Sequence, residues 1–504
     1  MSLSLASLLP ESARFSPERI AVISGGERVT YAQLWRQTCE IAAVLCARGV
    51  REGDNVALLM PNVPDFPRAY FAILALGAVV VPVHALLTPH EIAYVLNDSG
   101  ARLIVGHPLL GAGREGAQMA GIEYIEPACE DNGSVVPVVE RRPDDDAVIL
   151  YTSGTTGKPK GAVLTNLNMV VNATVCAQDM LLLGEGDVLL CALPLFHSFG
   201  QTVVMNAAFR AGATVVLMAR FDGSSALDLM VRENVTFFAG VPTMYVALLE
   251  AAKRDARRPP LRRLMSGGAP LPAALLQNIE KTFAVPVEEG YGLSETSPVA
   301  TFNQRAIGLK PGTVGVPIWG VDVRVAAADV EDRVLLLGPG ERGEIVIRGH
   351  NVFSRYLNNP EATAAAKIDG WFRSGDIGTI DDDGFITILD RKKDMILRGG
   401  FNVYPREVEE VMLQHPAIAQ CAVIGVPDQV HGEEVVAVVV SQQHARDSVS
   451  GEEIVAWARE HLARHKYPRR VEFVDGYPLG PSGKILKREL VARFSAPDQK
   501  ASVP

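Results

Sequence analysis

The segment at residues 151–161, with the sequence YTSGTTGKPKG, concentrates groups that bind phosphate. It holds four serine and threonine hydroxyls, three glycines and two lysines, directly after the apolar run 147–150. An apolar strand that opens into such a loop typically presents backbone N–H groups, hydroxyls and ammonium groups to a phosphate chain. A polar surface turn would account for the glycines but not for the lysines and hydroxyls together. We therefore predict a phosphate-binding loop here.

Two common nucleotide-binding motifs do not account for this chain. A Walker loop requires G-x-x-x-x-G-K-[S/T], whereas Gly154 and Gly157 stand too close together and Lys158 precedes a proline. Residues 111–116 (GAGREG) fit G-x-G-x-x-G, but residues 107–110 separate them from the preceding strand-like run, and no clear βαβ unit follows. A dinucleotide site at 111–116 is therefore disfavoured.

Residues 152–161 resemble the phosphate loop of the AMP-forming adenylating enzymes. This superfamily contains acyl-CoA synthetases, the adenylation domains of peptide synthetases and firefly-type luciferases. The resemblance implies that the ATP phosphates are bound by Thr152, Ser153, Gly154, Thr155, Thr156 and Lys160.

Two further segments resemble the family's nucleotide site. In YGLSET (291–296), the resemblance places Tyr291 on the adenine, Ser294 near the α-phosphate and Glu295 on Mg²⁺. A carboxylate suits a hard cation and an aromatic face suits a purine, so the chemistry agrees. SGGAP (266–270) resembles the loop that closes over the adenine and the acyl carbonyl. Other implied nucleotide contacts are Gly267, Gly268, Ala269, Glu289, Gly290 and Gly292.

The ribose and the acyl group have their own implied contacts. Asp376, which alone would more often be a turn residue, and Arg391 grip the ribose hydroxyls in the resembled family. His197, in PLFHSFG (194–200), corresponds to a residue at the acyl-pocket wall, although a lone histidine among aromatics is usually a core residue. We also expect Tyr245 to line the acyl channel. Gly268 and Gly292 complete the expected acyl pocket.

The C-terminal part of the chain carries the remaining implied residues. Lys484, after Ser-Gly in 478–488, corresponds to the lysine that contacts the carboxylate and the α-phosphate. Lys393 falls where the family has its hinge residue. Arg398, Gly399 and Gly400 are expected at the CoA tunnel, although the two glycines could also form only a turn before Phe401.

Length and composition set broad limits on the protein. With 504 residues, two or more domains are expected, and 48% hydrophobic and 21% charged residues are ordinary for a globular protein. The longest apolar run, 71–83, is too short to span a bilayer, and the N-terminus has no basic signal region. The six cysteines show no metal-binding spacing and indicate a reducing compartment, so we expect a cytoplasmic protein.

The formal net charge of −10 argues against nonspecific nucleic-acid binding. ATP, a carboxylate and CoA are all anions, so their site needs local positive charge. The sequence offers it at 391–398 and at 461–470. The second segment fits either a solvated helix end or a contact with CoA or a carrier protein.

The pattern of apolar residues predicts an α/β protein with two domains. We expect a large N-terminal domain at 1–389, with a small β-barrel-like subdomain from about residue 314. A hinge at 390–394 is followed by a small, mobile α+β domain at 395–504. Within that domain we expect a helix at 405–415, strands at 420–426 and 433–440, a helix at 451–464 and a strand at 470–474.

The resemblance covers residues 15–492 and is most similar to bacterial medium- and long-chain fatty acyl-CoA ligases. It implies that the chain uses ATP, Mg²⁺ and CoA to convert a carboxylic acid into an acyl-adenylate and then into acyl-CoA. The acid that we expect is a fatty acid. The alternative is a stand-alone ligase that loads an acyl carrier protein. A non-catalytic nucleotide-binding protein is disfavoured because both Lys484 and Glu295 are present. We expect a monomer or homodimer without an integral membrane segment.

Overall fold

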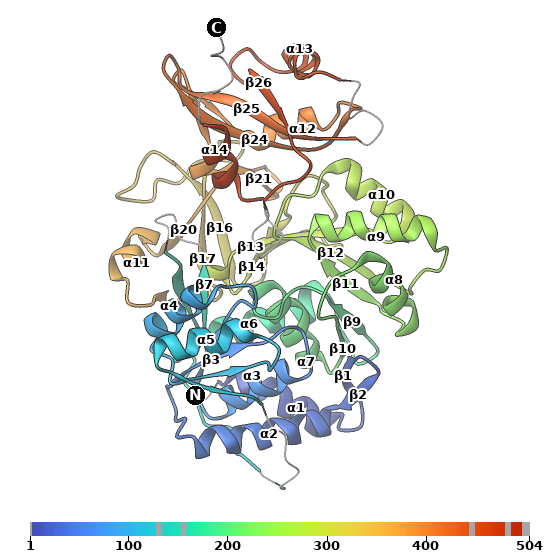
Figure 1. Ribbon diagram of the computed structural model, residues 1–504, viewed down its shortest axis with the longest axis vertical. Coiled ribbons are helices and arrows are strands. Elements are labelled where there is room, and N and C mark those ends of the chain that lie inside the picture. Colours follow the sequence, from blue (N-terminus) through green and yellow to red (C-terminus); the bar gives the residue numbers. More distant parts are fainter. Residues whose placement is uncertain are drawn as a thin grey trace. The chain divides into compact units, whose positions relative to one another are not determined.

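The computed structural model describes residues 3–127, 133, 135–152, 158–442, 449–478 and 485–495 (Figure 1). Ser153, Gly154, Thr155, Thr156 and Lys484 lie outside the described residues. The chain divides into two compact units. The first comprises Met1–Val323 and Val346–Arg373, and the second comprises Arg324–Ile345 and Ser374–Pro504. The hinge expected at 390–394 stays a prediction.

A nine-stranded sheet forms one half of the first unit. Its order is β15 (Val316–Pro317), β14 (Val299–Phe302), β13 (Val287–Gly292), β12 (Arg263–Gly267), β11 (Phe237–Gly240), β9 (Val188–Cys191), β10 (Thr214–Leu217), β1 (Ile20–Ser24) and β2 (Glu27–Thr30). The strands from β13 to β1 pair in parallel, whereas β14 and β2 pair antiparallel. Helices α8 (Gly223–Arg232), α9 (Pro242–Arg254) and α10 (Ala273–Phe283) share a core with this sheet, beside β11 and β12 in Figure 1. The expected α/β pattern is confirmed here.

A seven-stranded sheet forms the other half of this unit. Its order is β18 (Arg355–Tyr356), β8 (Lys160–Thr165), β7 (Asp146–Thr152), β4 (Val79–Pro82), β3 (Asn55–Leu59), β5 (Leu103–Gly106) and β6 (Glu123–Ile125). Helices α4 (Pro89–Ser99) and α5 (Gly111–Ala120) share its core. The GAGREG match lies inside α5, where a Cβ at Gly113 would come within 2.3 Å of Leu59. A Cβ at Gly116 would come within 2.7 Å of Ile92, so Gly113 and Gly116 serve helix packing.

The first unit also contains further helices and the short strand β19. They are η1 (Leu5–Ser7), α1 (Leu8–Phe15), α2 (Tyr31–Ala47), α3 (Asp65–Ala75), α6 (Asn166–Val175), η2 (Cys176–Met180), η3 (Phe199–Asn206), α7 (Ala207–Ala211), η4 (Ser294–Thr296), α11 (Pro360–Ala366) and β19 (Lys367–Ile368). The apolar run 71–83 ends α3 and continues into β4, as a buried helix followed by a strand. None of the described helices is both long and apolar enough to cross a membrane.

Strands make up most of the segment expected to be barrel-like, and β20 (Trp371–Ile380) is as long as ten residues. A five-stranded sheet contains β16 (Val321–Ala326), β17 (Gly343–Gly349), β20 and β19, with β21 (Ile386–Arg391) against β20. The one-turn helix η5 (Lys392–Asp394) follows β21.

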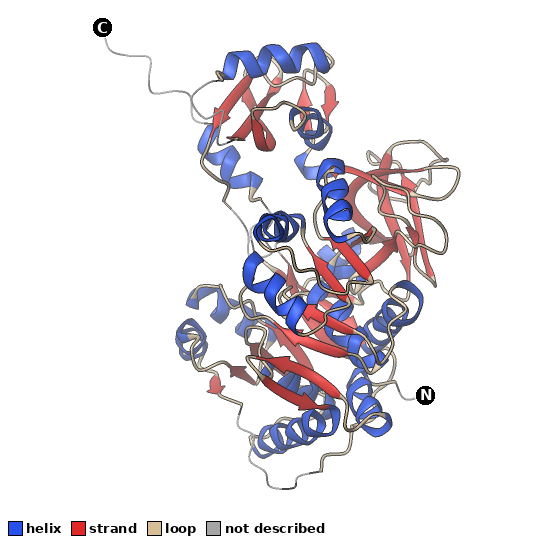
Figure 2. Ribbon diagram, turned by 90° about the vertical axis from the view of Figure 1, so that its right-hand side faces the viewer, coloured by secondary structure: helices blue, strands red, loops and turns tan. Residues whose placement is uncertain are grey.

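The C-terminal residues of the second unit form an α+β body (Figure 2). Its sheet has the order β23 (Phe401–Val403), β22 (Ile396–Arg398), β25 (Gly432–Ser441) and β24 (Ile418–Asp428), with β26 (Arg470–Phe473) against β25. Its helices are α12 (Pro405–Met412), α13 (Gly451–His461) and α14 (Lys487–Phe494). Alternate residues of β24 pack into two separate cores, one with α12 and α13 and the other with α14. Because both faces are covered, this strand is apolar at successive positions.

Candidate active site

The carboxylate of Glu295 lies where three segments of the first unit meet. Glu295 belongs to η4 and is 8% exposed. Its Oε1 accepts a hydrogen bond of 2.8 Å from Tyr356 Oη and one of 3.3 Å from Thr152 Oγ1. A carboxylate has about four lone-pair positions. Two donors on one oxygen therefore orient the group and leave capacity for a cation.

Tyr356 is a site residue that the sequence reasoning missed. Burial and the neighbouring Glu295 carboxylate raise the pKa of its hydroxyl well above the ordinary value, so it stays a proton donor. The Lys160 ammonium lies 5.4 Å from the centre of its ring. Tyr356 reaches the site because its strand, β18, pairs with β8, and this pairing places Tyr356 opposite Ala162. That long-range pairing leaves no signal in the local sequence.

The predicted phosphate loop connects two antiparallel strands rather than a strand and a helix. Strands β7 and β8 pair with Thr152 opposite Lys160, while residues 153–157 between them lie outside the described part of the chain. The pairing brings two of the predicted phosphate ligands, a hydroxyl and an ammonium group, to the same end of the hairpin.

Helix α4 holds both strands of this hairpin. The Tyr151 hydroxyl, next to Thr152, donates a 2.6 Å hydrogen bond to Asp98. The Tyr94 hydroxyl donates a 3.0 Å hydrogen bond to the carbonyl of Pro159, next to Lys160. The two side chains of α4 therefore hold the side chain of Tyr151 and the backbone of Pro159, each next to a predicted ligand.

Glycines let the backbone segments at the ends of β12 and β13 approach each other closely. Gly267 pairs with Gly290 in the parallel register of these strands. A Cβ at Gly267 would lie 3.2 Å from Gly290 O and 3.2 Å from Phe199 Cζ. At Gly292, a Cβ would lie 1.8 Å from Pro298 O, which no side chain can tolerate. Ligands of open α/β sheets commonly bind at the carboxyl ends of the strands.

Polar residues accompany these glycines. Glu289 is buried and pairs with Ser266 across the two strands. The Ser266 hydroxyl is enclosed and has no hydrogen-bond partner among the described residues. Tyr291 and Ser294 are half-buried, and Ala269 and the exposed Gly268 follow β12. A buried hydroxyl without a partner costs free energy, so Ser266 could donate to a bound ligand.

His197 lies on the turn that leads into η3. It is half-buried, and its Nδ1 accepts a 3.4 Å hydrogen bond from the Phe199 N–H. An accepting Nδ1 places the proton of the neutral ring on Nε2. Phe199 itself lies against Gly267, so this turn is brought to the end of β12.

Tyr245 is a core residue in this structure. It lies on α9, is 0% exposed and donates a 2.8 Å hydrogen bond to the carbonyl of Met265. Its ring packs edge-on against Phe238 at 5.4 Å between centroids. A role in the acyl channel stays a prediction.

The second unit brings the two predicted ribose contacts together. Asp376 and Arg391 face each other across β20 and β21, with 3.3 Å between Arg391 Nε and Asp376 Oδ1. Asp376 is buried. Lys393, the predicted hinge residue, is exposed on η5.

The predicted CoA-contacting residues form the turn between β22 and β23. Gly399 and Gly400 have φ values of +56° and +82°, in the left-handed region that favours glycine. Arg398 forms an ion pair with Glu434, whose hydrogen bond raises the arginine's pKa. Its charge is therefore already balanced within the unit.

The chain is similar to known proteins along nearly its whole length. The AMP-binding enzyme family matches residues 9–357, and the AMP-binding enzyme C-terminal domain matches residues 407–484. The feruloyl-CoA synthase of an Amycolatopsis species is 41% identical, covering 96% of this chain and 97% of the relative. The long-chain-fatty-acid–CoA ligase FadD13 of Mycobacterium tuberculosis is 38% identical over 97% of this chain and 98% of its own.

A solved structure shows the same fold. The crystal structure of ATP-bound MatB from Rhodopseudomonas palustris aligns with a TM-score of 0.90 and 32% identity, covering 98% of this chain and 99% of that one. The chain belongs to the AMP-binding enzyme family and, within it, to the adenylate-forming acyl-CoA ligases.

Proposed function

We propose that this ligase activates a carboxylic acid with Mg·ATP and passes the acyl group to CoA. The observation that carries the proposal is the buried Glu295 carboxylate, which accepts from Thr152 and from Tyr356, while the Lys160 ammonium lies over the Tyr356 ring. Its oxygen donors suit a hard cation. Mg²⁺, when bound, would be held by Glu295 and phosphate oxygens and would neutralise phosphate charge.

The protein's residues would position two anions for reaction. A carboxylate oxygen of the acid attacks the α-phosphorus of ATP, and the bond to pyrophosphate breaks. The CoA sulfur then attacks the acyl carbon, the bond to AMP breaks, and the thiol proton is released to solvent. Lys160 and Lys484 would offset negative charge in the first step. Asp376 would accept hydrogen bonds from the ribose, and Tyr291 would lie on the adenine.

We further propose that the acid carries a large hydrocarbon group. A Cβ at Gly267 would meet the Phe199 ring as well as the Gly290 carbonyl, and one at Gly268 would meet Val241 at 3.6 Å, so the side chains next to this loop are apolar. A fatty acid remains the first candidate. The relative named for long-chain fatty acids supports this first candidate, and the relative named for feruloyl-CoA makes a phenylpropenoic acid the second.

Acid-dependent exchange of pyrophosphate into ATP, measured over a panel of acids, tests the proposal. Thioester formation is then followed with CoA and, separately, with a phosphopantetheinylated carrier protein. Exchange with fatty acids and thioester formation with CoA are expected, and Glu295→Gln should abolish both. If pyrophosphate exchange occurs and the carrier protein is acylated, but no CoA thioester forms, then the acceptor is the carrier protein and not CoA.

A further inference from the structure

Lys367 begins the short strand β19 and donates to the backbone just ahead of Tyr356. Its Nζ donates one hydrogen bond of 3.1 Å to the carbonyl of Phe353 and another of 3.1 Å to the carbonyl of Ser354. The two acceptors belong to consecutive residues, so their carbonyl oxygens converge on one ammonium group. Because an ammonium group has three donors, one side chain can satisfy both. Lys367 therefore anchors two neighbouring residues at a single point.

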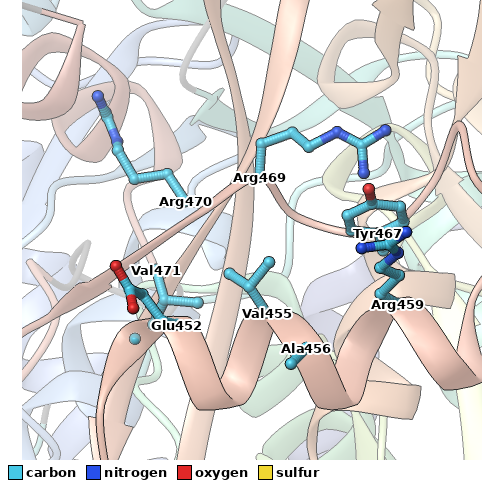
Figure 3. A pocket seen from close by; sticks show the side chains of 9 residues that line it. Glu452, Val455, Ala456, Arg459, Tyr467, Arg469, Arg470 and Val471 are labelled. Carbon is cyan, nitrogen blue, oxygen red and sulfur yellow. The ribbon is translucent and has the colours of Figure 1, made fainter.

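Lys367 is held by carbonyl groups and not by an acid. Within the described part of the chain, no carboxylate lies within ion-pair distance of its Nζ. Arg470 has the more usual arrangement. It lines a groove of about 520 Å³ between α13 and the segment that enters β26, and it forms an ion pair of 3.0 Å with Glu472 (Figure 3). Lys367 is half-buried and burial lowers its pKa, so its contacts with the two carbonyls must offset the cost of burying a charge.

The segment that Lys367 holds contacts Glu295 twice. The Phe353 N–H donates to the Glu295 carbonyl at 2.8 Å, and the Tyr356 hydroxyl donates to the Glu295 carboxylate at 2.8 Å. The rings of Phe353 and Tyr356 lie 4.7 Å apart between centroids. The Lys367 ammonium lies 5.6 Å from the centre of the Phe353 ring, and the Lys160 ammonium lies 5.4 Å from the centre of the Tyr356 ring. Lys367 is therefore linked to both groups that fix Glu295.

The strand that carries Tyr356 has few hydrogen bonds of its own. Strand β18 is two residues long, and its pairing with β8 is extended by one backbone hydrogen bond on either side, from Ser354 and from Leu357, each of 2.8 Å. A ladder this short leaves the position of Tyr356 dependent on further anchors. Lys367 supplies two hydrogen bonds at the end of β18 that is nearer to Phe353.

We propose that Lys367 is a positioning residue for adenylation, which acts through Phe353 and Tyr356 to hold the Glu295 carboxylate where it binds Mg²⁺. The proposal rests on the proposed function, in which Glu295 is the metal ligand. Residues that orient a metal ligand commonly change metal affinity or activity by about 10–100-fold when they are replaced, although they do not touch the ion. The effect of Lys367 should therefore be confined to the step that needs the metal.

The test begins with Lys367→Met, which deletes the ammonium donors and keeps most of the aliphatic stem. The Mg²⁺ concentration at half-maximal pyrophosphate exchange should rise about tenfold. Lys367→Arg keeps the charge and the donors and should recover most of the loss. Lys253→Met is the matched control, because this exposed lysine of α9 pairs with Glu250 at the surface, and it should behave as the wild type. Transfer from supplied acyl-adenylate to CoA should be unchanged in every variant.

ATP binding, measured by calorimetry without an acid substrate, separates positioning from damage to the fold. Mg²⁺ should tighten ATP binding to the wild type, and in Lys367→Met this gain should shrink about tenfold while the metal-free affinity is preserved. If Lys367→Met does not fold, the neutral variant Lys367→Gln provides the same comparison. A wild type whose ATP affinity is independent of Mg²⁺ would instead refute the metal site of the proposed function.

A double-mutant cycle asks whether Lys367 acts through the same carboxylate as Tyr356. The effects of Lys367→Met and Tyr356→Phe on half-maximal Mg²⁺ should be less than multiplicative, because both changes release Glu295. Multiplicative effects would overturn the proposal. So would a gain from Mg²⁺ in Lys367→Met equal to that of the wild type, or a lower melting temperature with unchanged Mg²⁺ dependence, which is the result of a purely structural role.

Discussion

Tyr356 and Glu295 are joined by a 2.8 Å hydrogen bond although they lie 61 residues apart in the sequence. The backbone reinforces this link, because the Phe353 N–H donates to the Glu295 carbonyl at 2.8 Å. The raised pKa of Tyr356 keeps its hydroxyl protonated, so it orients the carboxylate rather than competing with it for a cation. Tyr356 is thus a positioning residue for the proposed metal ligand.

Tyr356→Phe removes this hydroxyl and keeps the ring. A hydrogen bond to a charged group contributes about 1.5–3 kcal/mol, so we expect acid-dependent pyrophosphate exchange to fall at least tenfold. The Mg²⁺ concentration at half-maximal rate should rise, because Glu295 loses its orientation. Tyr31→Phe is the matched control, since that buried hydroxyl donates to the Ala213 carbonyl away from the site. Equal losses in the two variants would refute the positioning role.

Local patterns predicted most elements of the fold. The strands expected at 420–426 and 433–440 are present as β24 and β25, and the helices expected at 405–415 and 451–464 are α12 and α13. These elements follow from apolar periodicity, which the sequence displays directly. The strands at 316–317 and 355–356 are only two residues long, and their pairing depends on distant partners.

The site could be predicted only where a motif carries its own chemistry. Glu295 and Lys160 belong to recognisable motifs, and the structure places both beside Tyr356. Tyr356 is brought to the site by the long-range pairing of β18 with β8, which no local pattern encodes. The sequence also could not show that Tyr245 bonds to the Met265 carbonyl, because that contact depends on how α9 packs against β12.

Asp187 is predicted to make the first unit sensitive to acid. Burial alone would raise its pKa, but hydrogen bonds from Arg262, Gly184 and Thr236 lower it below the ordinary value. A lowered pKa stabilises the fold above the unfolded-state pKa of about 3.9, and the contribution is lost as the pH falls through the folded-state value. Asp187→Asn should therefore lower the urea midpoint at pH 7, and the difference from wild type should shrink below about pH 4. A difference that is constant with pH would contradict this account.

Lys484 lies outside the described residues, and its role is predicted from the resemblance alone. An ammonium group lowers the barrier to adenylation while the acid and ATP are both bound. Lys484→Ala should then cut pyrophosphate exchange by about 100-fold or more, the scale for one preorganised charge contact. Transfer from chemically supplied acyl-adenylate to CoA should be largely preserved. Equal loss of both half-reactions in a folded variant would argue against a role confined to adenylation.

Tyr94 and Asp98 are predicted to position Thr152 and Lys160 through the neighbouring residues Tyr151 and Pro159. Removing either contact should let the end of the β7–β8 hairpin shift and should raise the KM for ATP several-fold. The variants are Tyr94→Phe, which deletes one donor, and Asp98→Ala, which deletes one acceptor. Asp98→Asn keeps a side-chain oxygen that can accept from Tyr151, so it should restore most of the ATP affinity.

A purely structural role for the α4 contacts predicts a different result. Thermal stability would then fall in Tyr94→Phe and Asp98→Ala while the KM for ATP stayed at the wild-type value. The positioning role instead requires that the KM for ATP rise several-fold in both variants. It also requires that transfer from supplied acyl-adenylate to CoA be unaffected. Acyl transfer needs no triphosphate, so only adenylation should depend on where α4 holds Thr152 and Lys160.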